Sequence, residues 1–106
     1  MELNLKKIIL IMLIMLSLNA QALESIVGKV TLVEATYLPG SISFYMDTGN
    51  ATCPKGKWFK WSKNEENNKI VYSTLMTALV SGKKVRLYIN DNDTSCKGQF
   101  LHILAG

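Results

Sequence analysis

The chain is poor in the residues from which catalytic and metal sites are usually built. It has one histidine, two cysteines and two prolines among 106 residues. The histidine, His102, lies in an apolar run near the C-terminus, and no spacing in the sequence places a nucleophile and an orienting group beside it. A lone histidine in a strand favours a structural or surface role. We therefore predict that the chain is not an enzyme and needs no cofactor.

Metal binding has little support in the sequence. The two cysteines show no CxxC spacing. The run Asn90 to Asp93 alternates asparagine and aspartate, as calcium loops do, but it lacks the glycine and the distant glutamate of an EF-hand loop. Such residues are also typical of a turn, which is the interpretation we favour, and we expect no metal site.

A strong charge of one sign is also missing. The formal net charge is +4, and the basic residues are spread along the chain. Nucleic-acid binding needs a concentrated basic face. We therefore expect no nucleic-acid partner.

The N-terminal residues have the three parts of a secretory signal peptide. These parts are the positive residues Lys6 and Lys7, the apolar run Ile8 to Leu16, and the small-x-small site Ala20-Gln21-Ala22. The apolar run is too short to span a bilayer as a helix. We predict that residues 1–22 are a cleaved signal peptide. Residues 23–106 then form a single domain, exported by a bacterium to the periplasm or the medium.

Cys53 and Cys96 are predicted to form one disulfide. An even number of cysteines in a small exported domain is typical of a structural cross-link. The bond would close a loop of about 43 residues, for which chain entropy gives ~4 kcal/mol of stabilisation.

The stretch from Asn68 to Asn90 is predicted to be a helix followed directly by a strand. Apolar residues at helical spacing lead to Gly82, which suits a left-handed C-terminal cap. Asn67 or Asn68 is the expected N-cap. From Lys84 the period changes to two, with Val85, Leu87 and Ile89 on one face.

Four further strands are predicted, over residues 26–36, 41–47, 57–62 and 99–104. In the first strand, Ile26, Gly28, Val30 and Leu32 share one face, and Gly28 indicates a bulge or bend. In the second, Ile42, Phe44 and Met46 face the core. In the third, Phe59 and Trp61 are placed inward and Trp58 and Lys60 outward, although the reverse phase stays open.

The element order is three strands, a helix and two strands. This is the order of the OB-fold, a five-stranded, partly open barrel with a helix between its third and fourth strands. We therefore predict a mostly β domain with an OB-fold-like barrel. A small α+β sandwich is the second possibility.

The candidate ligand-binding residues lie on the second and third strands. Tyr45 and Ser43 would share the outer face with Trp58 and Lys60, and OB-folds use this surface for oligonucleotides and oligosaccharides. An aromatic ring beside polar groups suits stacking on a sugar ring. The other interpretation is that Trp58 packs under the helix or in a subunit interface, where aromatic residues are enriched.

The segment Tyr72-Ser-Thr-Leu-Met-Thr-Ala-Leu-Val-Ser-Gly-Lys-Lys-Val-Arg-Leu-Tyr-Ile resembles a helix and strand of the B subunits of subtilase cytotoxin and typhoid (pertussis-like) toxin. Val27-Gly28-Lys29-Val30 gives a weaker match to the first strand. The resemblance implies an OB-fold, a pentameric ring, binding of sialylated glycans, and delivery of a separate enzymatic subunit. Val27 stands where that family has its glycan-binding serine, so we do not transfer that site. Small exported bacterial proteins of no assigned activity share the Cys, Trp and Ser-Gly-Lys pattern too.

The leading hypothesis from the sequence is an exported, non-enzymatic binding domain of the toxin-B type. It would recognise a cell-surface glycan or a protein surface, in an oligomer such as the pentamer. The alternative is a monomeric periplasmic protein that binds or inhibits an envelope protein.

Overall fold

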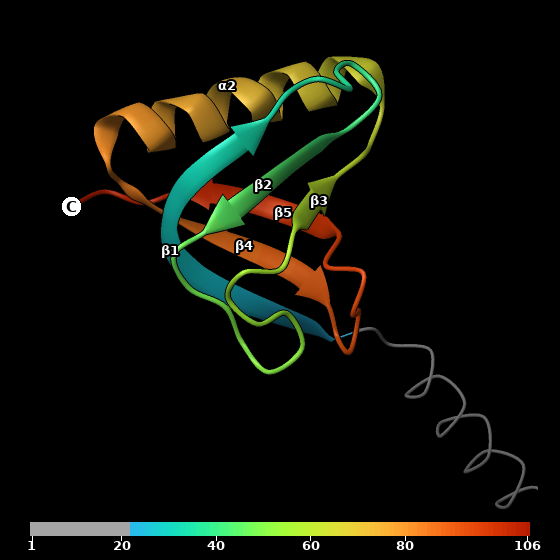
Figure 1. Cartoon of the computed structure of the whole chain (residues 1–106), viewed down its shortest axis with the longest axis vertical. Helices are drawn as coiled ribbons and strands as arrows, with labels where there is room; N and C mark the ends of the chain where they lie inside the picture. The colour runs from blue at the N-terminus through green and yellow to red at the C-terminus, as the bar shows by residue number, and fades with distance from the viewer. Residues whose placement is uncertain (1–21) are drawn as a thin grey trace, which may run out of the picture.

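The computed structural model describes residues 22–106, so the predicted signal peptide lies outside the described residues except for Ala22. The elements follow in the order β1 (Leu23–Glu34), β2 (Ile42–Met46), β3 (Phe59–Trp61), α2 (Glu65–Ser81), β4 (Lys84–Asn90) and β5 (Gly98–Ile103). The domain is therefore mostly β with one helix, in the predicted order (Figure 1). Within residues 22–106 the helix is not long and apolar enough to cross a membrane.

The five strands form one antiparallel sheet in the order β3-β2-β1-β4-β5. The long strand β1 bends so that its first half pairs with β4 and its second half pairs with β2 (Figure 1). The register of β1 against β2 shifts between Val30 and Leu32, which leaves Thr31 as the extra residue of a bulge. One strand therefore serves both halves of the sheet.

The predicted bulge at Gly28 is wrong in its position. Gly28 pairs regularly with Val85, and the residues after β2 pack directly against it. Thr48 donates its hydroxyl to the carbonyl of Val27 at 2.7 Å, and a Cβ at Gly28 would lie 2.2 Å from that hydroxyl oxygen. The glycine is needed for this close approach. The real bulge also turns Leu32 outward, with 41% of its surface exposed, against the prediction that it shares a face with Ile26.

The predicted barrel is not closed. The sheet has two edge strands, β3 and β5, which are joined by a single parallel bridge between Lys60 and Lys97. There the amide of Lys60 donates to the carbonyl of Cys96 at 3.1 Å. Because β3 has only three residues, it is too short for a continuous ladder to β5.

Helix α2 begins three residues before the predicted start. Asn64 is the N-cap: its side-chain oxygen accepts from the amide of Asn67 at 2.8 Å. The predicted caps, Asn67 and Asn68, lie inside the helix. Glu65 and Glu66 occupy the first turn, where their charge is favourable near the positive end of the helix dipole. The C-terminal prediction is confirmed, since Gly82 has φ 70° and its amide donates to Ala78.

Asn67 and Asn68 connect the helix to the sheet and its loops through side-chain hydrogen bonds. Asn68 is fully buried. Its Oδ1 accepts from the amide of Lys63 at 2.8 Å, and its Nδ2 donates to the carbonyls of Pro39 at 2.8 Å and Gly40 at 3.2 Å. Asn67 Oδ1 accepts from the indole N–H of Trp61 at 2.9 Å. These side chains bind the loops on either side of the β2–β3 pair to the first turns of α2.

The core lies between the inner face of the curved sheet and α2. It contains the residues predicted to face inward on β2 and β4, and on β3 it contains Phe59 and Trp61. The predicted phase of the third strand is therefore confirmed. The buried side chains are Ile26, Val30, Ile42, Phe44, Met46, Cys53, Phe59, Trp61, Val71, Leu75, Ala78, Val85, Leu87, Ile89 and Cys96.

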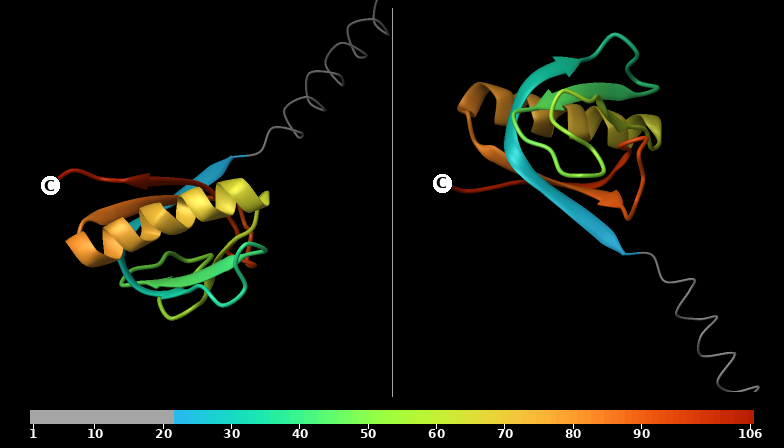
Figure 2. Two further views of the ribbon diagram at one scale, coloured as in Figure 1. Left: turned by 90° about the horizontal axis from the view of Figure 1, so that it is seen from above. Right: turned by 60° about the horizontal axis from the view of Figure 1, so that its bottom comes forward.

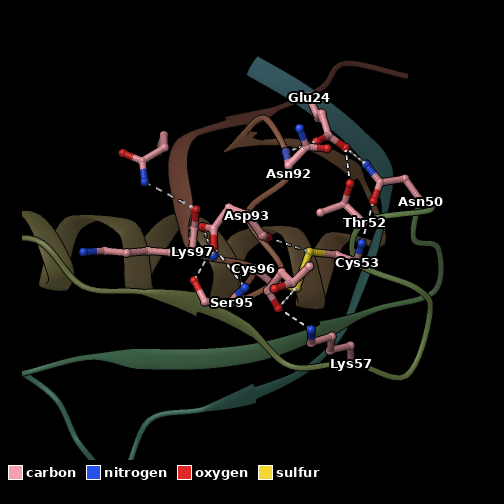
Figure 3. Close-up of a disulfide and its surroundings, with 12 residues drawn as sticks. Glu24, Asn50, Thr52, Cys53, Lys57, Asn92, Asp93, Ser95, Cys96 and Lys97 are labelled. Carbon is pink, nitrogen blue, oxygen red and sulfur yellow. Dashed lines mark hydrogen bonds between the residues drawn. A yellow bond between two sulfur atoms is a disulfide. The ribbon is translucent and has the colours of Figure 1, made fainter. Parts of the chain in front are cut away.

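The predicted disulfide between Cys53 and Cys96 is present. Both residues are fully buried, and the bond joins the loop after β2 to the loop after β4 (Figure 3). Such a bond is typical of a non-reducing compartment.

Glu24 links the same two loops beside the disulfide (Figure 3). Its carboxylate accepts from the amide of Asn92 at 2.7 Å, from the hydroxyl of Thr52 at 2.7 Å, and from the amide group of Asn50 at 3.1 Å. These hydrogen bonds lower the pKa of Glu24, and the bond from the Asn92 amide has the largest effect. The run Asn90 to Asp93 is therefore a turn held by hydrogen bonds, as predicted.

We expect the change Asn68→Ala to lower the free energy of unfolding by about 3 kcal/mol, because the buried side chain makes three hydrogen bonds to backbone groups. Urea unfolding with the disulfide intact measures this. The matched control is the exposed cap Asn64→Ala, which should cost about 1 kcal/mol. Equal costs for the two variants would contradict the anchoring role of Asn68.

Replacing Cys53 and Cys96 together by alanine should lower the free energy of unfolding by about 4 kcal/mol, because the unfolded chain gains the freedom of the opened loop. Urea unfolding with and without reductant measures the effect. Reductant should destabilise the wild-type protein and leave the double variant unchanged. A double variant as stable as wild type would contradict the structural role of the bond.

Candidate ligand-binding face

The four predicted site residues lie together on the outer face of β2 and β3. Ser43 pairs with Lys60, and Phe44 pairs with Phe59. Trp58 directly precedes Phe59, so it lies opposite Tyr45. The alternation that buries Phe44 and Phe59 turns Ser43, Tyr45, Trp58 and Lys60 outward.

Tyr45 and Trp58 form a stacked aromatic pair. Their ring centroids are 3.8 Å apart, and the ring planes differ by 18°. Trp58 is 37% exposed, whereas Tyr45 is half-buried. Each ring covers one face of the other, and Trp58 keeps exposed surface that a ligand can contact. Trp58 is exposed and is not part of the core beneath the helix, whereas Trp61 is buried there and donates its indole N–H to Asn67.

The second half of β1 adds two residues to this face. Leu32 pairs with Tyr45, and Glu34 pairs with Ser43. The face therefore has two parallel rows across three strands. The apolar row is Leu32, Tyr45 and Trp58, and the polar row is Glu34, Ser43 and Lys60. We call these six residues the outer β2 face.

The polar row offers three different groups to a ligand. Glu34 supplies a carboxylate, Ser43 a hydroxyl and Lys60 an exposed ammonium group. Hydrogen bonds from the side chain of Thr36, and from its amide at 2.7 Å, lower the pKa of Glu34. The carboxylate therefore stays ionised below the ordinary pH range of glutamate and remains an acceptor.

Sequence reasoning missed Leu32 and Glu34 because of the bulge. Strict alternation from Ile26 turns Leu32 toward the core, and the extra residue Thr31 reverses the phase of the strand after it. The only signal in the sequence is that the alternation of β1 breaks down around Glu34.

The other candidate residues do not assemble into a site. His102 is exposed on β5, where its ring meets Tyr88 edge-on with centroids 5.4 Å apart. Within residues 22–106 there is no group of three or more histidine, cysteine or acidic side chains that could hold a metal ion.

No protein-family model, curated protein or solved structure matches the chain in comparisons with known proteins. The outer β2 face is therefore the feature from which a function can be inferred.

The two tryptophans should differ sharply in their contribution to stability. Trp61→Ala removes a core side chain and should lower the free energy of unfolding by about 4 kcal/mol. Trp58→Ala removes only a surface stack, and we expect about 1 kcal/mol. Urea unfolding of both variants provides the measurement. A cost for Trp58→Ala as large as that for Trp61→Ala would show that Trp58 serves the fold and is not available to a ligand.

Proposed function

We propose that this protein is an exported, non-enzymatic binding domain that recognises a glycan through the outer β2 face. The observation that carries the proposal is the exposed Tyr45–Trp58 stack beside the row Glu34, Ser43 and Lys60. A sugar ring has an apolar C–H face and polar hydroxyls at its edge. A flat aromatic surface with a few polar groups next to it fits both.

An OB-fold interpretation supports the same face. The element order, the long bent β1 shared by two halves of the sheet, and the bridge between β3 and β5 all agree with an open form of this fold. OB-folds bind oligosaccharides on strands 2 and 3 and on the neighbouring loops. In this chain the loop after β1 carries Tyr37, which is 69% exposed.

The disulfide and the signal-peptide pattern together support a location in the periplasm or outside the cell. The toxin resemblance further implies a ring of five copies with a separate enzymatic subunit. All six residues of the outer β2 face come from one copy of the chain. Glycan recognition by this face therefore requires neither the ring nor the enzymatic subunit.

A second candidate is a periplasmic protein that binds or inhibits an envelope protein as a monomer. The same stack supports it, because exposed tryptophan and tyrosine side chains are the commonest anchors of protein interfaces. The two candidates differ in their response to free sugars. Free sugars should displace the ligand from Trp58 if the ligand is a glycan, and should have no effect if it is an envelope protein.

The test is a glycan array with the oxidised mature protein, followed by titration of the best glycan. We expect Trp58→Ala and Tyr45→Ala each to weaken binding by about tenfold or more, which corresponds to ~1.4 kcal/mol of lost stacking. The control is Phe100→Ala, which removes an exposed aromatic ring from a different part of the sheet.

Arrays of neutral and acidic glycans then identify the role of Lys60. If the ligand is acidic, Lys60→Ala should weaken its binding more than that of a neutral glycan. Absence of glycan binding would contradict the proposal, as would a loss caused equally by Phe100→Ala. Capture of an envelope protein that depends on Trp58 and is indifferent to sugars would establish the second candidate.

A further inference from the structure

Strand β5 is an edge of the sheet. It pairs with β4 on one side, and within residues 22–106 its other side makes only the bridge at Lys97, just before the strand begins. Figure 2 (left) shows β5 and the C-terminal residues at the margin of the domain, alongside α2.

The backbone of β5 has hydrogen-bonding groups that point away from β4. The amide of Leu104 donates to the carbonyl of Lys84 at 2.8 Å, so this pair is a hydrogen-bonded pair of the ladder. Such pairs alternate with non-bonded pairs in an antiparallel sheet. In the observed register, Ile103 opposite Val85 and Leu101 opposite Leu87 are therefore non-bonded. The amides and carbonyls of Leu101 and Ile103 face the open edge.

The two edges of the sheet differ in charge. The edge strand β3 carries Lys60 and is flanked by Lys57 and Lys63. Lysines on an edge strand oppose pairing with another chain. From Gly98 to Gly106, in contrast, the chain contains no lysine, arginine, aspartate, glutamate or proline. Strand β5 itself therefore has none of the side chains that usually block strand addition. Two lysines lie at its start, where Lys97 precedes the strand and Lys63 Nζ donates to Gln99 Oε1 at 3.0 Å.

The helix face next to this edge is also uncharged. Ser73, Thr74 and Thr77 of α2 line a shallow hollow of about 170 Å³ together with Ile103. No charged residue occurs on the helix from Ile70 to its C-cap Gly82. The β5 edge and the neighbouring helix face thus form one continuous uncharged surface.

We propose that two copies of this chain pair through their β5 edges in an antiparallel, two-fold dimer. A two-fold contact places the same surface of both copies together, so like charges on that surface would repel. From Phe100 onward on β5, and from Ile70 onward on α2, the chain carries no charged side chain, and Lys63 and Lys97 lie at the start of the strand. The strand that this surface would receive is identical to the strand that it presents. A second copy therefore fits both the open backbone groups and the neutral side chains.

The open groups favour one register. Both Leu101 and Ile103 are used when Leu101 of one copy lies opposite Ile103 of the other. The two-fold axis then passes beside His102, which meets His102 of the second copy as a non-bonded pair. Their Cα atoms would be about 4.5 Å apart. Phe100 would lie opposite Leu104, away from the axis.

The first test is the native mass of the oxidised mature protein, measured by light scattering at high micromolar concentration. We expect about two chains for wild type. Ile103→Lys places a charge at a residue that is 40% exposed, so it should fold and become monomeric. The control Leu32→Lys adds the same charge at a residue of equal exposure and should stay dimeric. A wild-type monomer, or a mass of about five chains, would overturn the proposal.

Cysteine cross-linking tests the register. His102→Cys should form a disulfide-linked dimer within the oxidised protein, because the predicted Cα separation suits a disulfide. Phe100 is exposed too, but it lies away from the two-fold axis and so does not face Phe100 of the other copy. Phe100→Cys should therefore cross-link far more slowly. Equal rates for the two variants would overturn the two-fold register. Light scattering and cross-linking are both measured without any glycan. Their outcome is therefore independent of whether the outer β2 face binds one.

A third variant distinguishes pairing with a second copy of this chain from binding of another peptide at the β5 edge. Leu101→Pro removes an outward amide and leaves the ladder to β4 without a lost bond. It should abolish dimerisation while the circular dichroism of the fold is kept, and Ile103→Lys replaces it as the test if the proline variant does not fold. If wild type is a monomer that binds an added synthetic peptide of residues 98–106, the edge is a site for extended peptides and the dimer is wrong.

Discussion

The whole domain depends on one long strand, β1, that joins the two halves of the sheet. β1 pairs with β4 over its first half and with β2 over its second half, and the bulge at Thr31 lies near the start of the part that pairs with β2. A bulge bends a strand and increases its twist, so the sheet curves around its inner face. The curvature makes room for one helix to cover the core. It also brings the two edge strands close enough for the single bridge between Lys60 and Lys97.

The loops of this domain are fixed more firmly than its short strands would suggest. The disulfide and Glu24 hold together the loops that follow β2 and β4. At the other end, Asn68 binds the loops beside β2 and β3 to the helix. A three-residue strand such as β3 cannot hold its own position by pairing alone. These anchors position it, and with it Trp58 and Lys60.

The exposed surface then divides into two regions with different chemistry. The outer β2 face combines stacked aromatic rings with a carboxylate, a hydroxyl and an ammonium group, which is the mixture that a polar ligand with an apolar face requires. The β5 edge offers open backbone groups and neutral side chains, which suit another strand. Because the two regions lie on different strands, ligand binding and self-association need not compete.

The sequence by itself determined the local structure. Periodicity identified the helix, the five strands and the inward residues of β2 and β4, since each element repeats its contacts at a fixed spacing. Two cysteines in a small domain indicated the disulfide, and alternation placed Ser43, Tyr45, Trp58 and Lys60 on one side of their strands. Tertiary structure decided what depends on distant contacts. The bulge that adds Leu32 and Glu34 to the outer β2 face arises from pairing on both sides of β1. The burial of Asn68 moves the helix cap back to Asn64, and the short β3 leaves the sheet open. None of these has a periodic signature, because each results from residues that are far apart along the chain.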